Sequence, residues 1–381
     1  MQFKYKTAPH YRQALTTQRI MRDLVIGLLV VYAFALYRAA TLGTEYLINA
    51  IVLMLSSVMT AILTEVVWAK VTKKKVVPYL KSSFGVVTAI IITLMVPVNT
   101  GVYALSVSTF VAIFFGKLVF GGFGQNIFNP AGVGRAIVFT SFANAVNADL
   151  VTSATPTSTI ASSGWMMSGE GFATFLSDFG GLSNMLIGNY NGAMGETSAL
   201  VILIVGAILA YREVLDWRVP ATYLGVIFIG AYLVGLLNGL GLEYALFHVL
   251  TGGAVFGAVF MLTDPVTNPN TRAGRIVFAA CAGFITMVIR LCGNLPEGVL
   301  FSILMCNILT PVIDKFFDGK QVDKEKRNNK LVPIFVGLVI VMIGALGFTL
   351  NSDKEYTSSL ASYNTNNVIS VNANAQNQGG K

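Results

Sequence analysis

The sequence has few charged residues for its length. Asp, Glu, Lys and Arg make up only 12% of its 381 residues, whereas 54% are hydrophobic and the mean hydropathy is +0.68. A soluble domain carries about 25% charged residues, so the composition excludes a water-soluble fold. The charges also lie in short clusters, separated by apolar stretches near the length of about 20 residues that a helix needs to cross a bilayer.

Residues that bind metals or haem are also scarce. The three cysteines, Cys281, Cys292 and Cys306, lie in apolar segments and are not spaced as CxxC, so neither a disulfide framework nor a cysteine-ligated cluster is indicated. The two histidines, His10 and His248, offer no pair for a bis-histidine haem. We therefore expect no metal site, and we interpret the cysteines as small core residues.

The net charge of +8 does not indicate nucleic-acid binding, because the basic residues form no stripe on a soluble module. They lie between apolar segments, where Lys and Arg set the orientation of a membrane protein. With residue 1 in the cytoplasm and the segments crossing alternately, about 22 of the 26 Lys and Arg lie on the cytoplasmic side. We therefore predict a cytoplasmic N-terminus.

The apolar segments show no alternation of the kind that barrel strands show. Because only helices and closed barrels satisfy their backbone in hydrocarbon, we predict an all-α polytopic membrane protein. About ten transmembrane helices are expected, in two related five-helix halves, with an extra C-terminal apolar helix. The eleven segments span approximately residues 24–40, 45–69, 83–98, 102–120, 131–146, 196–214, 219–238, 243–262, 276–293, 298–314 and 331–350.

The chain divides accordingly into five predicted parts. A weak internal echo favours the two halves, because Asn129-Pro130 and Asn268-Pro269 each precede a Gly-Arg pair and an apolar segment. Chance similarity is the alternative explanation. The parts are a cytoplasmic N-terminal segment (1–23), a first transmembrane half (24–146), an extracytoplasmic loop (147–195), a second transmembrane half (196–317), and a charged linker, additional helix and polar extracytoplasmic tail (318–381).

Two glycine-rich segments carry polar side chains near the predicted membrane. Phe120–Pro130 contains Asn126 and Asn129, which favours a pocket for a planar, hydrogen-bonding cofactor. Helix caps in an ordinary turn are the alternative. Gly188–Ser198 contains Glu196 and opens an apolar segment, where backbone N–H groups can bind a phosphate; a simple turn in which Glu196 complements the helix dipole is the alternative.

Three acids lie within or beside apolar segments. Glu65, Asp264 and Asp314 are placed toward the predicted cytoplasmic ends of their spans. Ionisable groups at membrane depth are costly and usually functional, whereas side chains at a helix end can reach water cheaply. We interpret the three acids as candidates for a cation path, with this solvated position as the alternative.

The polar motifs resemble those of a known family. Ala8–Arg12, Thr16-Thr17 and Ile20-Met21 resemble the opening of the D subunit of the Rnf electron-transport complex, a ferredoxin:NAD+ oxidoreductase coupled to cation translocation. The Asn-Ile-Phe-Asn-Pro run at 126–130, the Gly-Glu-Thr-Ser loop at 195–198 and Thr-Asp-Pro-Val-Thr at 263–267 resemble segments shared with the B subunit (NqrB) of the sodium-pumping NADH:quinone oxidoreductase. The resemblance covers about residues 5–318.

This resemblance implies a covalent FMN, joined by a phosphoester to a threonine in an extracytoplasmic loop. The attachment pattern of the family is matched by Asp149, Ser153, Ala154 and Thr155, with Ser153 where a glycine is common. Thr155 is therefore the expected acceptor. A non-covalent riboflavin is implied toward the cytoplasmic side. Further cofactor contacts are expected from Glu196 and Thr197 beside the FMN, and from Asn126 and Asn129 at the riboflavin.

The function that the resemblance implies is an electron relay in the bacterial cytoplasmic membrane. The chain would act with the other Rnf subunits (A, B, C, E and G), above all with the flavinylated G subunit, and would contribute to Na+ or H+ translocation. It would be an enzyme only as part of that complex. The alternatives are an NqrB-like component of the sodium-pumping NADH:quinone oxidoreductase, and a channel or carrier for a small neutral solute, which broken helices in duplicated halves also suit.

Overall fold

The computed structural model describes residues 16–142, 155–165, 167, 169–190, 192–196, 198–293, 298–317, 327–328 and 330–350. Every regular element among these residues is a helix, which confirms the predicted all-α fold. The helices before residue 143 are α1 (Thr17–Leu42), α2 (Thr44–Val71), α3 (Val76–Ser83), α4 (Gly85–Leu94), α5 (Val102–Ile113), its π-helical continuation η1 (Phe114–Leu118) and α6 (Pro130–Ser141).

The remaining helices form a short outer group and a second bundle. The short group is α8 (Pro156–Ser162), α9 (Gly169–Asp178) and α10 (Gly181–Ile187). The second bundle is α11 (Ala199–Tyr211), α12 (Arg218–Leu237), α13 (Gly241–Leu250), α14 (Ala254–Phe256), the π-helix η2 (Gly257–Met261), α15 (Arg272–Cys292), α16 (Val299–Phe317) and a C-terminal helix (Lys330–Leu350).

Capping side chains explain where several helices begin. Thr16 caps α1, Asn129 caps α6 and Thr271 caps α15, each by accepting a backbone N–H from the first turn. Pro130 follows at the first position of α6, where its missing N–H leaves no hydrogen bond unmade. These boundaries follow directly from local sequence.

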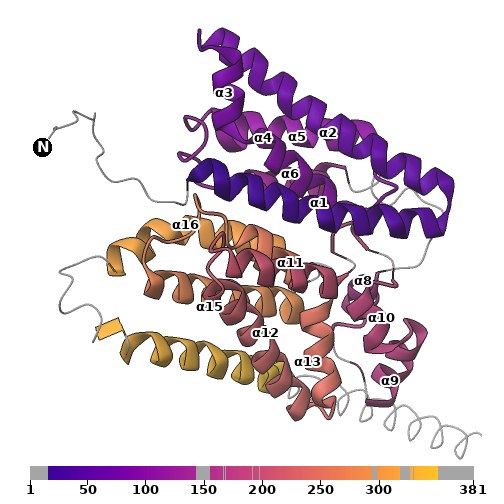
Figure 1. The fold of residues 1–381 in the computed structure, drawn as a ribbon. Helices are drawn as coiled ribbons and strands as arrows, with labels where there is room; N and C mark the ends of the chain where they lie inside the picture. The colour runs from indigo at the N-terminus through magenta and orange to yellow at the C-terminus, as the bar shows by residue number, and fades with distance from the viewer. Residues whose placement is uncertain are drawn as a thin grey trace, which may run out of the picture.

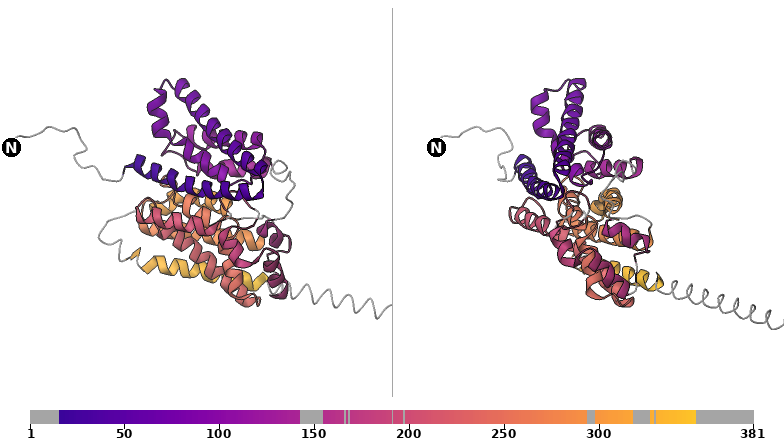
Figure 2. Two further views of the ribbon diagram at one scale, coloured as in Figure 1. Left: turned by 45° about the vertical axis from the view of Figure 1, so that its right-hand side comes forward. Right: turned by 90° about the vertical axis from the view of Figure 1, so that its right-hand side faces the viewer.

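The first and second bundles pack side by side. In Figure 1, α1–α6 lie above α11–α16, and α8–α10 lie at the end of the molecule opposite the start of α1. α1 contacts α11, and α6 contacts α16, across the junction. The views in Figure 2 show the same two groups, with the C-terminal helix on the outside of the second bundle. There Ile343 packs against Gly230 of α12, and Gly347 packs against Val234.

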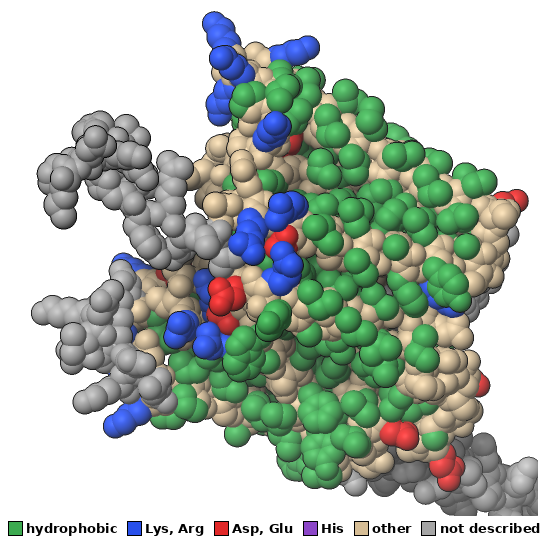
Figure 3. Space-filling view, viewed as in Figure 1, with side chains coloured by type: hydrophobic (Ala, Val, Ile, Leu, Met, Phe, Trp, Pro, Cys, Tyr) green, Lys and Arg blue, Asp and Glu red, His purple; other side chains and the backbone are tan. Residues whose placement is uncertain are grey.

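The helices have the dimensions and the surface of a multi-pass membrane protein. Six of them are long and apolar enough to cross a membrane, or eight if each of two bent pairs is one span. The α5–η1 and α11 helices are shorter and apolar. Hydrophobic side chains cover most of the face in Figure 3, while Lys and Arg gather toward the end where α1 begins. Ten crossings and a cytoplasmic N-terminus stay predictions.

The two bent pairs occupy the third apolar segment of each predicted half. α3 and α4 meet at 47°, and α13 and α14–η2 meet at 57°. Phe84 adopts a left-handed conformation (φ 56°) at the first break, and Gly252 and Gly253 do so (φ 65° and 68°) at the second. A broken helix leaves backbone carbonyls without intrahelical partners, so each break needs donors from elsewhere.

A buried cation supplies those donors at each break. Lys117 of η1 donates to the carbonyl of Ser83, and Arg290 of α15 donates to the carbonyls of His248 and Thr251. Both cations come from the fourth apolar segment of their half. The Asn-Pro echo instead falls on the fifth segment of the first half and the fourth of the second. The helix breaks and their buried cations therefore occupy equivalent positions in the two halves, whereas the Asn-Pro echo does not. That the two halves are related stays a prediction.

Candidate functional site

Thr155 caps the start of α8, which lies at the end of the molecule away from the start of α1 (Figure 1). Its hydroxyl accepts the backbone N–H of Ser158 at 3.1 Å and donates to the Ser158 hydroxyl at 3.0 Å. Pro156 follows at the first helical position. The Thr155 side chain is half-buried. A phosphoester on this oxygen would remove the donated bond and leave the oxygen as an acceptor, so the position is compatible with the attachment that the sequence predicts.

The segment that follows Thr155 is fixed to the second bundle through Trp165. The Trp165 ring stacks on His248 with ring centroids 5.4 Å apart, and the Arg290 guanidinium lies 5.7 Å from its centre. Tyr244 donates to the Trp165 carbonyl at 2.9 Å. All four side chains are buried. This cluster holds α8 against the break between α13 and α14.

The same break brings Thr157 and Glu196 together. A Cβ on Gly252 would lie 2.9 Å from the Thr157 methyl group, and a Cβ on Gly253 would lie 2.7 Å from a carboxylate oxygen of Glu196. Only glycine permits these approaches at a positive φ. The loop before α11 and the segment after Thr155 therefore both approach this break. Gly195 donates to the carbonyl of Leu94 at 2.7 Å and fixes this loop to the end of α4.

Three predicted cofactor contacts cannot be placed in this geometry. Ser153, Ala154 and Thr197 lie outside the described residues, as does Asp149. The predictions made for them therefore stay predictions.

A pocket lies at the opposite end of the molecule, beside the start of α1. The pocket has a volume of about 60 Å³ and opens to solvent. Ligand pockets of about 300–1,000 Å³ are typical, so this cavity is too small to enclose a planar ring system, which would have to extend into its solvent-open mouth. Phe84, Phe123 and Phe260 supply aromatic walls. The polar lining residues are Thr88, Lys117, Asn126, Asn129, Thr263 and Asp264.

The two asparagines of this pocket differ in what holds them. Asn129 caps α6 with its side-chain oxygen, donates its side-chain N–H to the carbonyl of Met261 at 3.3 Å, and donates its backbone N–H to Asn307 at 2.9 Å. It thereby joins α6, η2 and α16. Asn126 donates its side-chain N–H to the carbonyl of Phe128 at 2.9 Å. Asn129 thus has a structural role, and Asn126 is the better candidate for contact with a cofactor.

Glu65 lies behind the pocket in a buried ion pair. One of its carboxylate oxygens is 3.0 Å from the Lys117 ammonium, and both side chains are 2% exposed. The same oxygen accepts the Ser83 hydroxyl at 2.5 Å. Glu65 is therefore not a solvated charge at a helix end, which was the alternative for this residue.

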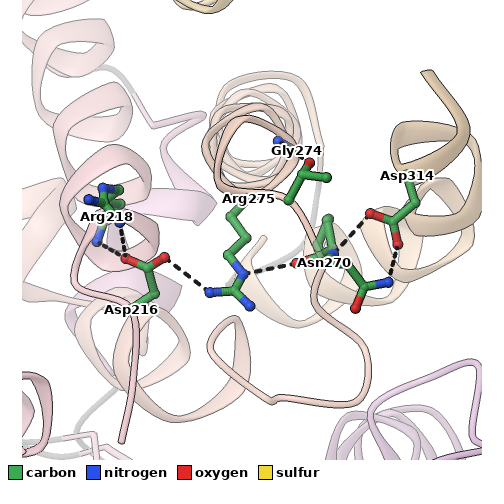
Figure 4. Close-up of polar contacts among 8 residues, drawn as sticks. Asp216, Arg218, Asn270, Gly274, Arg275 and Asp314 are labelled. Carbon is green, nitrogen blue, oxygen red and sulfur yellow. Dashed lines mark hydrogen bonds and ion pairs between the residues drawn. The ribbon is translucent and has the colours of Figure 1, made fainter. Parts of the chain in front are cut away.

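Asp264 and Asp314 lie in different surroundings. Asp264 lines the pocket and accepts the Thr267 hydroxyl at 3.0 Å, and desolvation raises the pKa of its carboxyl. Asp314 accepts both the backbone N–H and the side-chain N–H of Asn270, at 2.9 and 3.1 Å (Figure 4). Within the described residues Asp314 is not part of the pocket lining, so the structure does not bring the three acids into one site.

Figure 4 shows that Asp314 belongs to a polar network at the ends of three helices. Asp216 pairs with Arg218 at 3.5 Å and with Arg275 at 3.1 Å, and Arg275 also donates to the carbonyl of Pro269. This network fixes the loop between η2 and α15 that carries Asp264.

Sequence reasoning missed the buried cations. The predicted alternation of the segments places Lys117 near a cytoplasmic boundary and Arg290 near an outer one, yet both are buried, Lys117 at 2% and Arg290 at 0% exposure. Each stands alone among apolar residues in the sequence. An isolated cation inside an apolar segment is the available signal, because such residues usually face the bundle interior.

Comparison with known proteins finds a family whose sequence pattern this chain matches. The NQR2, RnfD, RnfE family matches residues 4–323. The D subunit of the proton-translocating ferredoxin:NAD(+) oxidoreductase complex of Clostridium ljungdahlii is 33% identical over 327 residues, covering 82% of this chain and 94% of that protein. The D subunit of the Na(+)-translocating complex of Acetobacterium woodii is 34% identical, covering 81% and 92%.

Relatives of a second kind match a shorter region. The B subunit of the Na(+)-translocating NADH-quinone reductase of Pseudomonas aeruginosa is 33% identical over 252 residues, which is 60% of this chain and 58% of that protein. The family match ends at residue 323, so the C-terminal helix lies beyond it.

Proposed function

The chain belongs to the NQR2, RnfD, RnfE family, and from this we propose that it is the membrane-embedded D subunit of an ion-translocating ferredoxin:NAD+ oxidoreductase complex. Within that complex it relays electrons through an FMN bound covalently to Thr155 and a riboflavin bound in the pocket beside Lys117. The relatives that are D subunits match over most of their length, whereas the B subunit of the quinone reductase matches over little more than half. This difference favours the ferredoxin-linked complex over an NqrB-like role.

The separation of the two sites is the observation that carries the proposal. Thr155 caps α8 beside the α13–α14 break, and the pocket lies beside the start of α1. α8 and the start of α1 lie at opposite ends of the bundle (Figure 1). A relay across a membrane requires a redox group near each face. When bound, a flavin supplies an isoalloxazine ring that takes up and releases one or two electrons.

The residues of the outer site would hold the covalent group at the molecule's surface. Ser158 directs a backbone N–H at the Thr155 oxygen, and the Trp165 cluster fixes the helix that carries it. Glu196 reaches the adjacent helix break. Electrons would arrive here from the flavinylated G subunit, one of the other Rnf subunits of the complex.

The residues of the inner pocket would bind the ring between aromatic walls and supply charge. Asn126 offers polar contact, Lys117 offers a positive charge and Asp264 offers a negative one. We assign cation uptake to Glu65 and Asp264, beside the pocket, with Asp314 acting by holding the neighbouring loop. The face with the gathered Lys and Arg (Figure 3) would be cytoplasmic, in a bacterial cytoplasmic membrane.

Flavin fluorescence tests the proposal. The denatured, gel-separated chain from its native host should fluoresce under ultraviolet light, and Thr155→Val should abolish the signal. Thr157→Val is the matched control, because it removes a neighbouring hydroxyl that bonds Thr155 at 3.1 Å but leaves the acceptor in place. A non-fluorescent wild-type chain would contradict the proposal and favour a solute carrier.

A further inference from the structure

Lys117, Glu65 and Ser83 form a closed polar cluster at the break between α3 and α4. The Lys117 ammonium donates to a carboxylate oxygen of Glu65 at 3.0 Å and to the backbone carbonyl of Ser83. The Ser83 hydroxyl donates to the same carboxylate oxygen at 2.5 Å. The ammonium therefore sits among oxygen atoms, and carboxylate and carbonyl oxygens are also the ligands that hard metal cations prefer.

The broken helix favours both charges of this cluster. α3 ends at Ser83 and presents its C-terminal carbonyls to the ammonium, while α4 begins at Gly85 beside the Glu65 carboxylate. Cations are stabilised at helix C-termini and anions at helix N-termini. Gly85 allows the close approach, since a Cβ there would overlap a Glu65 carboxylate oxygen. Discontinuous helices with unwound carbonyls bind alkali cations in membrane transporters in this way.

The Lys117 side chain also borders the inner pocket, into which its ammonium could withdraw. Lys117 lines the inner pocket, and Asp264 lines the same pocket. A lysine side chain is a flexible four-carbon stem that carries a point charge. Withdrawal of the ammonium toward the pocket would leave the Glu65 carboxylate buried without its partner, a state that an incoming cation would relieve.

We propose that Glu65 and Ser83 form a monovalent-cation site that the Lys117 ammonium fills as a tethered internal cation. A free alkali cation binds there only when the ammonium withdraws into the pocket. The cause of this withdrawal rests on the proposed function. A group bound in the pocket gains negative charge when it is reduced, and this charge attracts the Lys117 ammonium. The site itself depends only on the cluster.

Cation-dependent stability of the purified complex tests the site. Thermal midpoints are compared in sodium, potassium and lithium chloride against choline chloride at equal ionic strength. Lys117→Met removes the internal cation, so at least one alkali cation should raise the midpoint by several degrees with saturation, as expected when a ligand binds only the folded state. The wild-type complex should show no such rise, and the Glu65→Gln/Lys117→Met double variant should lose it.

Matched controls keep the result specific. Lys81→Met removes an exposed lysine near the same helix break and should behave as the wild type does. If Lys117→Met does not yield folded complex, Lys117→Gln gives the same comparison with a side chain that can still donate to Ser83. A folded, neutral variant at position 117 that does not respond to any alkali cation overturns the proposal, and so does a wild-type response of equal size. Covalent flavin in the same samples reports separately on the proposed function.

Discussion

The position of the Glu65 carboxylate requires a glycine at residue 85. A Cβ at position 85 would overlap the Glu65 carboxylate, so Gly85→Ala should displace it from Lys117. Breaking a buried ion pair costs about 3–5 kcal/mol, and we expect a lower thermal midpoint for the complex. Gly225→Ala on α12 is the control, because a Cβ there meets no atom within 4 Å. Equal midpoints for the two variants would contradict this account of the break.

Substitutions of the two pocket asparagines should have different effects. Asn129→Ala removes a helix cap, worth about 0.5–2 kcal/mol, together with its bonds to η2 and α16, so it should lower stability. Asn126→Ala should lower the content of non-covalent flavin with little change in stability. Thermal unfolding and flavin release from the denatured complex measure the two effects. Loss of flavin from Asn129→Ala alone would reverse the assignment.

Individual residues were predictable where a local motif determines their role. Asn126 and Asn129 were recognised from their glycine-rich segment, and the alternative role of Asn129 as a cap is the one that the structure supports. Lys117 and Arg290 were not recognised, because their partners are backbone carbonyls of other helices. The isolation of each cation among apolar residues indicates that it is buried, but the sequence does not show which carbonyls it bonds.

At the level of helices, each buried cation should protect the backbone at its own helix break from hydrogen exchange. Arg290→Met removes donors to the carbonyls at the end of α13, where a bond to a charged group contributes about 1.5–3 kcal/mol. Hydrogen exchange should then rise at 248–254 and in α8, and stay unchanged at the α3–α4 break. Lys117→Met should give the reverse pattern. Exchange that rises at both breaks in either variant would show that the breaks are not independent.

The helices themselves were largely predictable, but their breaks were not. Each of the eleven apolar segments contains a helix, because length and hydropathy determine which stretches satisfy their backbone in lipid. The bends at Phe84 and at Gly252 fall inside apolar segments. Phe84 is not a helix-breaking residue type, and its neighbours Ser83 and Gly85 meet Lys117 and Glu65, so tertiary contacts contribute to the first break.

For the molecule as a whole, the C-terminal helix should contribute little to stability. It lies beyond the family match at residue 323 and packs on α12 through Ile343 and Gly347. Lipid tails can replace such contacts with little loss, since they are as apolar as the side chains. A chain ending at residue 323 should therefore keep its covalent flavin and lose only a little thermal stability. Complete loss of flavin on truncation would give the helix a role in the outer site.

The overall organisation follows from the charges and the apolar segments together. The clusters of Lys and Arg gather at one end of the bundle (Figure 3), as the sequence predicts. The opposite end carries Thr155, and the proposed relay runs between a flavin on this residue and the pocket beside the start of α1. The proposed relay depends on the attachment of FMN to the Thr155 hydroxyl.

Mass spectrometry of the peptide spanning Asp149–Ser158, taken from the native host, tests that claim most directly. The account predicts a peptide heavier by one FMN joined through a phosphoester, with fragment ions that place the addition on Thr155. A peptide found only at its unmodified mass, or with the flavin on another residue, would contradict it.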